Sequence, residues 1–436
     1  MQFNGLDYLN TRLMFGMQPG LESTQKLCHV LGNPQSRFKS IHVVGTNGKG
    51  STSYYLAGIL KAHGLKVGLF TSPHLVSLCE RIRIDDVPIA LEDLDRYLLR
   101  VRDAAQTISA NEDIPFEPTF FEVLTLVGFL YYADQGVDVA VLEAGMGGRL
   151  DSTAVAQGEM AVVTSIGLEH TEVLGSTEAQ ILKEKMGVLG NFEGCAKDKS
   201  FILGGLSGGL LQKANEYAGF LGARVLCPEV NRQLVLANLG QHYKENASLS
   251  ISAAKEFLKG GSREYKAAVV EDCLPNLSWA GRMQLLKNGE GKVQFILDGA
   301  HNSHAVKRLV ESIAEYYPGV KFRCIFGALK DKDVSEMLKF MAPFVDSFYL
   351  TKTMYPRFRE LDELKKIMQD LNLEVGGQGI FSREFIDQVR KESDPRVPVL
   401  ITGSLYMIGE CILHLRDDYA ELSYFKGLLP STTEHR

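Results

Sequence analysis

Residues 41–52 read IHVVGTNGKGST, an apolar segment that runs directly into a turn with three glycines and one lysine. The segment 41–44 predicts a buried strand, 51–63, which Gly64 ends, predicts a helix, and 67–71 predicts another strand. Glycines at such a junction let successive backbone N–H groups and the helix N-terminus surround a phosphate, and Lys49 adds a positive charge for the β- and γ-phosphates. An ordinary strand-to-helix turn is the alternative. A lysine among three glycines directly before a helix favours a phosphate loop.

The loop departs from the strict Walker A pattern. Residue 43 is Val, and Gly50 stands between Lys49 and Ser51. The residues that we expect to hold phosphate are Gly45, Thr46, Asn47, Gly48, Lys49, Gly50, Ser51 and Thr52.

The rest of the chain alternates between strand and helix patterns, which predicts an α/β fold with parallel sheets. Near-continuous apolar runs at 137–142 and 160–166 are typical of strands buried on both faces. The stretch 274–281 breaks the periodicity and is the best linker candidate. Beyond it, strand patterns at 293–297, 322–326, 348–351 and 397–401 are each followed by a helical pattern. We therefore expect an N-terminal P-loop-type domain with its hinge at 1–284 and a smaller Rossmann-like α/β domain at 285–436.

Length and composition agree with two domains in an ordinary globular protein. The chain has 436 residues, more than one core usually supports. Its net charge of −6 argues against a nucleic-acid partner, and it has no signal-peptide h-region or membrane-spanning apolar run. Its seven cysteines are odd in number and never spaced as C-x-x-C. They predict free thiols in a reducing compartment, so a cytoplasmic location is expected.

Two further side chains follow predicted strands and are candidates for a metal site. Glu143 closes the strand pattern at 137–142, at the carboxyl end where α/β sheets place their ligands. A nucleotide needs Mg²⁺, which prefers hard oxygen ligands. A salt bridge to Arg149 is the alternative for Glu143, and the nearby phosphate loop favours the metal role. His170 lies just past the next strand pattern and by itself stays unassigned.

Taken together, the motifs resemble those of the folylpolyglutamate synthase and dihydrofolate synthase family, relatives of the cell-wall Mur ligases. The resemblance covers nearly the whole chain, and its strength lies in many blocks in one order. These blocks are GTNGKGS (45–51), TSPHL (71–75) followed by ERI (80–82), LEAGMGGRLDST (142–153), EH (169–170), KEKMG (183–187), AGRMQ (280–284), DGAHN (298–302), GALKDKD (327–333) and TGSLY (402–406).

The resemblance implies a role for each matching residue. It implies a Mur-ligase-type ATPase domain and an ATP site in which Lys49 and the loop amides hold phosphates, together with Arg282 at the hinge. Ser51 or Thr52 would lie near the metal, and Mg²⁺, with two ions expected, would be bound by Ser72, Glu143 and His170. Lys185 would be carbamylated by CO₂. The remaining implied contacts are Asn246 with adenine, Asp298 with ribose, Ser72, Pro73 and His74 with the folate, and His301 and Ser404 with glutamate.

Several alternatives stay open at this point. Lys185 lies on a helical pattern and could belong to a solvated face with i,i+4 pairing. Asp298 could merely cap the following helix. The sequence also departs from the family pattern at Glu169, Ala280, Ala154 and Tyr243.

The implied activity is an ATP-dependent ligase. It adds L-glutamate to dihydropteroate, or to the γ-carboxyl of a folate polyglutamate, through an acyl phosphate. A cell-wall Mur ligase is the nearest rival, but only 44 residues precede Gly45, too few for a typical extra domain. A GTPase-type switch would be expected to carry an Asn-Lys-x-Asp motif, which does not occur. The expected partners are ATP, glutamate and the pterin substrate. A monomer is the expectation, whereas the preferred acceptor and the product length are open.

Overall fold

The computed structural model describes residues 4–14, 20–111, 116–190, 196–206, 208–259, 261 and 263–415. The chain divides into two compact units. Unit 1 comprises Met1–His74, Leu78–Val235 and Tyr243–Leu277, and unit 2 comprises Leu75–Ser77, Leu236–His242 and Ser278–Arg436. The main division thus falls inside the 274–281 stretch, whereas the sequence predicts one continuous boundary after residue 284. Two short segments inside the predicted N-terminal domain, 75–77 and 236–242, also belong to unit 2.

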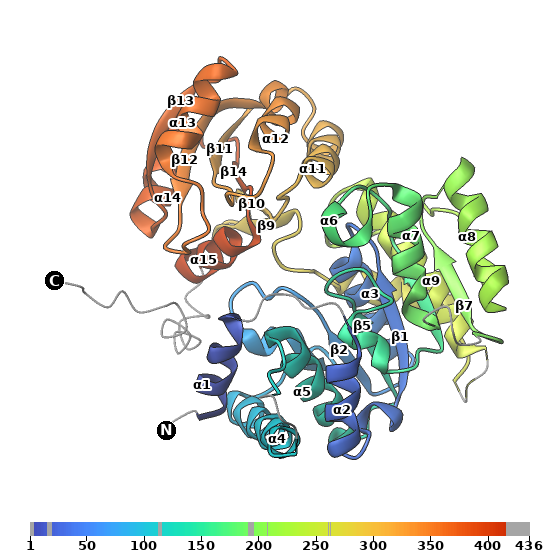
Figure 1. Ribbon diagram of the computed structural model, residues 1–436. Helices are drawn as coiled ribbons and strands as arrows, with labels where there is room; N and C mark the ends of the chain where they lie inside the picture. Colours follow the sequence, from blue (N-terminus) through green and yellow to red (C-terminus); the bar gives the residue numbers. More distant parts are fainter. Residues whose placement is uncertain are drawn as a thin grey trace. The chain divides into compact units, whose positions relative to one another are not determined.

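Unit 1 is built on an eight-stranded sheet with the order β4-β3-β2-β5-β1-β6-β7-β8 (Figure 1). Neighbours from β2 to β8 run parallel, and the β2–β3 and β3–β4 pairs are antiparallel. The strands are β1 Lys39–Val44, β2 Val67–Phe70, β3 Ile82–Ile84, β4 Val87–Pro88, β5 Val139–Glu143, β6 Met160–Val163, β7 Ser200–Leu203 and β8 Arg224–Leu226.

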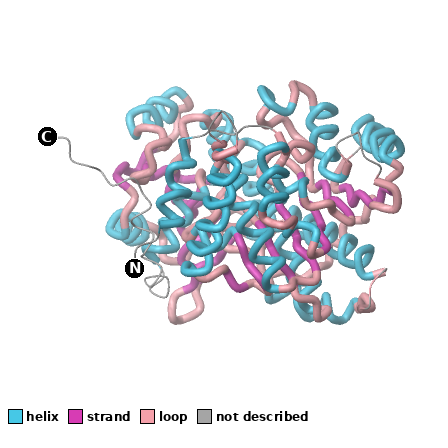
Figure 2. The backbone as a smooth tube through the Cα atoms, turned by 60° about the horizontal axis from the view of Figure 1, so that its bottom comes forward, coloured by secondary structure: helices cyan, strands magenta, loops and turns pink. Residues whose placement is uncertain are grey.

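Helices cover this sheet because its central strands are apolar on both faces (Figure 2). Helix α3 packs on β1, β2 and β5, and α7 packs on β6 and α8. The helices are α1 Asn4–Thr11, α2 Glu22–Val30, α3 Lys49–Ala62, α4 Leu91–Ser109, α5 Phe120–Gln135, α6 Thr171–Leu174, α7 Glu178–Met186, α8 Gly208–Leu221, α9 Gln241–Leu258 and α10 Ala267–Cys273. Short 3₁₀ turns are η1 Arg12–Met14, η2 Pro34–Ser36, η3 Leu78–Arg81, η4 Ser152–Val155, η5 Gly187–Leu189 and η6 Leu274–Asn276.

Unit 2 contains a six-stranded sheet with the order β13-β12-β11-β14-β10-β9, parallel except for the β9–β10 pair. Its strands are β9 Gln284–Lys287, β10 Val293–Asp298, β11 Phe322–Phe326, β12 Val345–Lys352, β13 Val375–Ile380 and β14 Val399–Thr402. Its helices are α11 Ser303–Tyr316, α12 Val334–Met341, η7 Ala342–Phe344, α13 Leu361–Asp370, α14 Arg383–Glu392 and α15 Leu405–Leu415.

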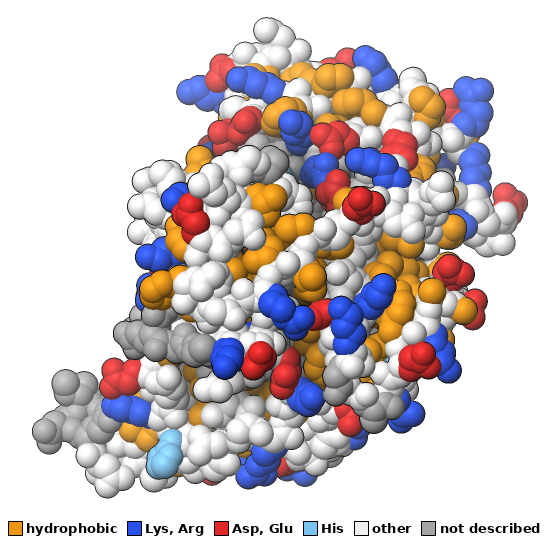
Figure 3. All heavy atoms as spheres, turned by 90° about the vertical axis from the view of Figure 1, so that its right-hand side faces the viewer, with side chains coloured by type: hydrophobic (Ala, Val, Ile, Leu, Met, Phe, Trp, Pro, Cys, Tyr) orange, Lys and Arg blue, Asp and Glu red, His pale blue; other side chains and the backbone are white. Residues whose placement is uncertain are grey.

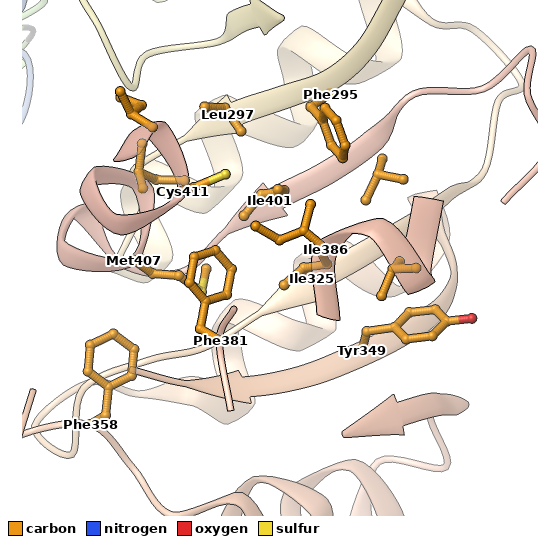
Figure 4. Close-up of a cluster of buried hydrophobic side chains, with 14 of the residues drawn as sticks. Phe295, Leu297, Ile325, Tyr349, Phe358, Phe381, Ile386, Ile401, Met407 and Cys411 are labelled. Atoms are coloured by element: carbon orange, nitrogen blue, oxygen red, sulfur yellow. The ribbon is translucent and has the colours of Figure 1, made fainter. Parts of the chain in front are cut away.

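The core of unit 2 joins α14 and α15 to the sheet (Figure 4). Met407 and Cys411 of α15 pack with Ile325 of β11 and Ile401 of β14, all fully buried. Residues three and four apart on a helix share a face, which explains why Met407 and Cys411 enter the same core.

The predicted α/β class with two mostly parallel sheets is confirmed. The strand predicted at 160–166 ends earlier, at Val163, because the chain turns there toward the phosphate loop. The strands that the sequence did not predict are β3, β4, β7, β8, β9 and β13, most of them short or at sheet edges. Of these, β13 reads VGGQGI, and three glycines weaken the strand pattern.

On the face drawn in Figure 3, basic and acidic side chains are interspersed among hydrophobic ones. Across the described part of the chain, no helix combines the length and apolar character needed to cross a bilayer.

Candidate functional site

The carboxyl ends of four neighbouring strands meet at one edge of the unit 1 sheet. Val43 of β1 lies opposite Glu143 of β5, and Val44 lies opposite Val163 of β6. Phe70 of β2 lies opposite Leu142 of β5. The loops after these strands therefore begin at nearly the same level, which is where open α/β sheets bind their ligands.

The loop 45–48 joins β1 to α3 and is fastened to the loop after β6. The N–H of Thr46 donates to the carbonyl of Ser165 (2.8 Å), and the N–H of Asn47 donates to the hydroxyl of Ser165 (3.0 Å). Gly48 occupies the position before α3 with φ +85°, a backbone conformation that favours glycine. The loop thus delivers the chain to the N-terminus of a 14-residue helix, where anions are favoured.

Gly48 is also required for close packing. A Cβ atom at this position would lie 2.6 Å from the side-chain oxygen of Asn246. Asn246 is on α9 and is 7% exposed. This places the amide of Asn246 directly against the turn that begins α3. Asn246, for which the resemblance implies an adenine contact, therefore lies next to the phosphate loop.

Two lysine ammonium groups converge on one carbonyl of the loop. The Nζ of Lys49 donates to the carbonyls of Gly45 (3.0 Å) and Thr46 (3.2 Å). The Nζ of Lys185, from α7, donates to the same Gly45 carbonyl (2.8 Å). Lys185 is 3% exposed, so the solvated-face alternative for this residue is wrong.

Burial and the neighbouring cation both act on Lys185. Desolvation and then the positive charge of Lys49 lower the pKa of Lys185 from 10.5 to about 7, against smaller opposing effects of Glu169 and Asp151. A large fraction of Lys185 is therefore a neutral amine at neutral pH, and a neutral amine is nucleophilic.

Glu143 and Ser72 are linked across β5 and β2. Glu143 is the last residue of β5 and is 4% exposed. Its Oε2 accepts the backbone N–H of Ser72 (2.9 Å), next to the cis Ser72–Pro73 peptide bond. Arg149 forms its ion pair with Glu184 instead (3.0 Å), so the alternative salt bridge for Glu143 is wrong.

His170 lies at the start of α6, in the loop that follows β6. It adopts φ +50°, and its carbonyl accepts the N–H groups of Val173 and Leu174. The preceding residues hold this loop on the phosphate loop, since Thr46 Oγ1 donates to the carbonyl of Gly167 (3.1 Å). Among the described residues, no group of three or more His, Cys, Asp or Glu side chains could hold a metal by itself.

In unit 2, the site residues expected from the sequence gather around Gly299. A Cβ atom on Gly299 would lie 3.4 Å from Nη1 of Arg282 and 2.8 Å from Cγ of Leu405, the residue after Ser404. The Nδ1 of His301 is 2.8 Å from the carbonyl of Gly299. Arg282, His301 and the Ser404–Leu405 turn therefore lie at one carboxyl edge of this sheet.

Asp298 fixes the backbone next to Gly299 and Arg282 through hydrogen bonds. Its carboxylate is 4% exposed and accepts the N–H groups of Met283 (2.8 Å) and Ala300 (2.9 Å). The cap of α11 is Asn302, whose side chain accepts the N–H of Ala305, so the capping alternative for Asp298 is wrong. Ser404 is 1% exposed, and its hydroxyl has no hydrogen-bond partner within the described residues.

The sequence analysis assigned no role to three residues that shape these loops. Asn238 is 3% exposed and clamps the hinge, with hydrogen bonds to the backbone of Trp279 (3.0 and 3.1 Å) and to the carbonyl of Arg282 (2.5 Å). No local pattern could have identified it, because its partners lie about forty residues away. Asp151 accepts from Thr153 (2.6 Å) and from the N–H of Met146 (3.0 Å) and so fixes the loop after β5. The Asp-x-Thr spacing is a turn signal that could have revealed it.

The third residue without an assigned role is Arg81, which lies beside the expected folate loop. Its Nε donates to Nδ1 of His74 (2.9 Å), and its guanidinium lies 5.5 Å from the centre of the Phe120 ring. Burial, and then the charge of Arg81, lower the pKa of His74 to about 3, so the imidazole is neutral and can accept this hydrogen bond.

Two family models match this chain. The Mur ligase middle domain matches residues 43–203, and the glutamate ligase domain of Mur ligases matches residues 281–405. These ranges contain the loops described above in units 1 and 2.

Individual relatives match most of the chain and point to one family of ligases. The chain is 29% identical over 424 residues to the dihydrofolate synthase/folylpolyglutamate synthase of Bacillus subtilis, covering 92% of this chain and 96% of the relative. It is 30% identical over 382 residues to that of Mycobacterium tuberculosis, covering 80% and 77%. The structure is similar to that of Mycobacterium tuberculosis folylpolyglutamate synthase complexed with ADP and AMPPCP (TM-score 0.81, 26% identity, covering 95% and 99%). It is also similar to a bifunctional synthase with Mn, AMPPNP and L-glutamate bound (TM-score 0.79, 26% identity, covering 94% and 98%). The chain therefore belongs to the dihydrofolate synthase/folylpolyglutamate synthase family, ATP-dependent ligases of the Mur ligase family.

Proposed function

We propose that this protein joins L-glutamate to dihydropteroate, to the γ-carboxyl of a folate polyglutamate, or to both, at the expense of ATP. The observation that carries the proposal is the edge of the unit 1 sheet, where a phosphate loop, Glu143 and the buried Lys185 meet. The names of the relatives, and the nucleotide and glutamate bound in a similar structure, support the same reaction.

ATP binds with its phosphates in the loop 45–52. Lys49 lies on the carbonyls of its own loop, and a bound phosphate offers its ammonium a stronger, charged acceptor. Asn246 lies against Gly48 and contacts the adenine side. We also propose Arg282 as a contact to the phosphates and Asp298 as a contact to the ribose, as the family resemblance implies.

The donor set fits Mg²⁺. The protein supplies one buried carboxylate, Glu143, with Ser72 beside it and His170 in the next loop. Mg²⁺ commonly takes only one or two carboxylates and completes its shell with waters and substrate phosphates, so a larger cluster of protein ligands is not required. When bound, the ions, of which we propose two, neutralise charge on the transferring phosphoryl group.

Lys185 acts as a carbamate. Its neutral amine attacks the carbon of CO₂, a new N–C bond forms, and a proton leaves for solvent. The pKa of about 7 favours this step because an ammonium has no lone pair to donate. The product is an anion beside the Lys49 ammonium, which would stabilise it, as Mg²⁺ would when bound.

The reaction begins with the acceptor carboxylate, which cannot react with an amine because its leaving group is poor. Its oxygen attacks the γ-phosphorus of ATP, ADP leaves, and an acyl phosphate forms. The glutamate amine, oriented by His301 and Ser404, attacks the acyl carbon, and phosphate departs. Ser72, Pro73 and His74 lie on the acceptor side, where exclusion of water protects the acyl phosphate from hydrolysis. We propose a cytoplasmic monomer as the working form.

The test is a comparison of acceptors with purified protein, ATP and glutamate. Dihydropteroate and tetrahydrofolate are supplied separately, and products are identified by mass. We expect a product heavier by one glutamyl residue with at least one acceptor, and none without ATP. The proposal would be contradicted if the protein glutamylated neither dihydropteroate nor tetrahydrofolate.

A further inference from the structure

Residues 72–74, expected to contact the folate, form what we call the acceptor loop. The three residues that follow this loop belong to a different unit from the loop itself. Ser72, Pro73 and His74 are part of unit 1, and the next residues, Leu75–Ser77, are part of unit 2. The chain returns to unit 1 at Leu78. We call Leu75–Ser77 the strap.

Helix α15 has a glycine where the strap crosses it. Gly409 lies in the middle of α15, whose sequence LYMIGECILHL is otherwise rich in helix-forming and apolar residues. A helix-interior glycine is normally unfavourable relative to alanine. Here a Cβ atom would collide with the carbonyl oxygen of Leu75 and would lie 2.7 Å from its carbonyl carbon. The missing side chain thus allows the strap backbone to lie on the helix.

A second glycine receives the side chain of Leu75. At Gly281, which has φ +68°, a Cβ atom would lie 3.2 and 3.4 Å from the two methyl groups of Leu75. Leu75 and Val76 also pack against the hydrophobic core of unit 2, and Ser77 is 3% exposed. The strap is therefore a built part of unit 2.

The other end of the acceptor loop is held in unit 1. The N–H of Ser72 donates to Glu143 (2.9 Å), and His74 accepts from Arg81 (2.9 Å). His74 and Leu75 are consecutive residues, so the backbone passes directly from the residues held in unit 1 to the seat of Leu75. The position of the strap on α15 consequently limits the conformations that Ser72, Pro73 and His74 can adopt.

We propose that Leu75 and Gly409 are positioning residues for the acceptor. They contact no reacting atom. Instead, the seat of the strap on α15 sets the conformation of the loop 72–74 that binds the pterin substrate. The inference rests on the proposed function only for the identity of that substrate.

The test replaces Gly409 by alanine and compares it with a matched glycine. Gly219 lies inside α8, and a Cβ atom there would meet nothing within 4 Å, so Gly219→Ala is the control. Hydrogen exchange of the segment 71–77 is measured without ligands, together with KM for the acceptor and the affinity for ADP. For Gly409→Ala we expect exchange about tenfold faster and an acceptor KM about tenfold higher, with ADP affinity unchanged.

Leu75→Ala, which removes side-chain contacts without a collision, should change both quantities in the same direction and keeps the test valid if Gly409→Ala does not fold. Wild-type exchange of 71–77 in the folded variants would overturn the proposal, as would an affinity for ADP that falls as much as the acceptor KM rises. If exchange accelerates as expected but wild-type protein uses neither acceptor, the proposed function fails and the seat of the strap stands.

Discussion

Replacing Lys185 by methionine should stabilise the protein at neutral pH, although it removes a central residue of the site. Lys185 is almost fully buried, and the ammonium of Lys49 shares its carbonyl acceptor. Both effects disfavour the protonated form, so the pKa of Lys185 falls from 10.5 to about 7. Methionine has a similar length and carries no charge to desolvate.

The pH dependence follows from proton uptake. Between about pH 7 and pH 10.5 the unfolded chain holds a proton on Lys185 that the folded protein lacks, so the free energy of unfolding rises with pH, by up to about 1.4 kcal/mol per unit. Below pH 7 the penalty is fully present, with an upper bound of roughly 5 kcal/mol. The variant loses one hydrogen bond to Gly45, worth about 1 kcal/mol. The net gain is therefore about 4 kcal/mol near pH 6, falls to zero near pH 10, and becomes a net loss of up to about 1 kcal/mol at higher pH.

The assay is urea unfolding of wild type and Lys185→Met between pH 6 and 10 in buffers freed of CO₂. Lys213→Met, at an exposed lysine on α8, is the control and should follow the wild-type curve. The two stability curves of wild type and Lys185→Met should converge as pH rises. Parallel curves would refute the argument, because they would mean that Lys185 titrates normally in the folded protein.

Three shorter predictions concern other residues. Glu143→Gln should lower turnover by about 100-fold or more and weaken Mg²⁺ dependence without unfolding the protein, and a normal Mg²⁺ titration would contradict it. Gly48→Ala should abolish ATP binding measured by calorimetry, because its Cβ meets Asn246, whereas Gly136→Ala, also at positive φ but in open space, should bind ATP normally. Burial raises the pKa of Glu410 to about 7, so its burial is destabilising above pH 4.5 and most so above pH 7. Glu410→Gln should therefore unfold at higher temperature than wild type at pH 8 but not at pH 4.

Local sequence pattern predicted the central strands of both sheets and the helix after β1, although α3 begins at Lys49 and not at Ser51. β1 and β5 are apolar on both faces, and the glycine-rich turn after β1 fixes where α3 begins. Edge strands such as β13 were missed because a strand with one neighbour needs little apolar character.

The limits of sequence reasoning are clearest where distant segments meet. The helical pattern around Lys185 favours a solvated face, yet Gly45, 140 residues away, accepts its hydrogen bond and the surrounding loops bury it. The assignment of the strap to unit 2 could not be predicted either, because nothing in the local sequence of Leu75–Ser77 distinguishes it from its neighbours in unit 1. The positions at which the sequence departs from the family pattern, Ala280, Ala154, Glu169 and Tyr243, did not reveal their structural surroundings either. Tyr243, for example, is buried on α9.

The central claim is that ATP activates the acceptor carboxylate by phosphorylation, and transfer of labelled oxygen tests it most directly. The acceptor is prepared with ¹⁸O in its reacting carboxylate and incubated with the protein, ATP, Mg²⁺ and glutamate, and the released phosphate is examined by mass spectrometry. An acyl phosphate requires that each phosphate released during ligation carry one oxygen from the acceptor. Phosphate free of ¹⁸O, released in step with the glutamylated product, would contradict the account.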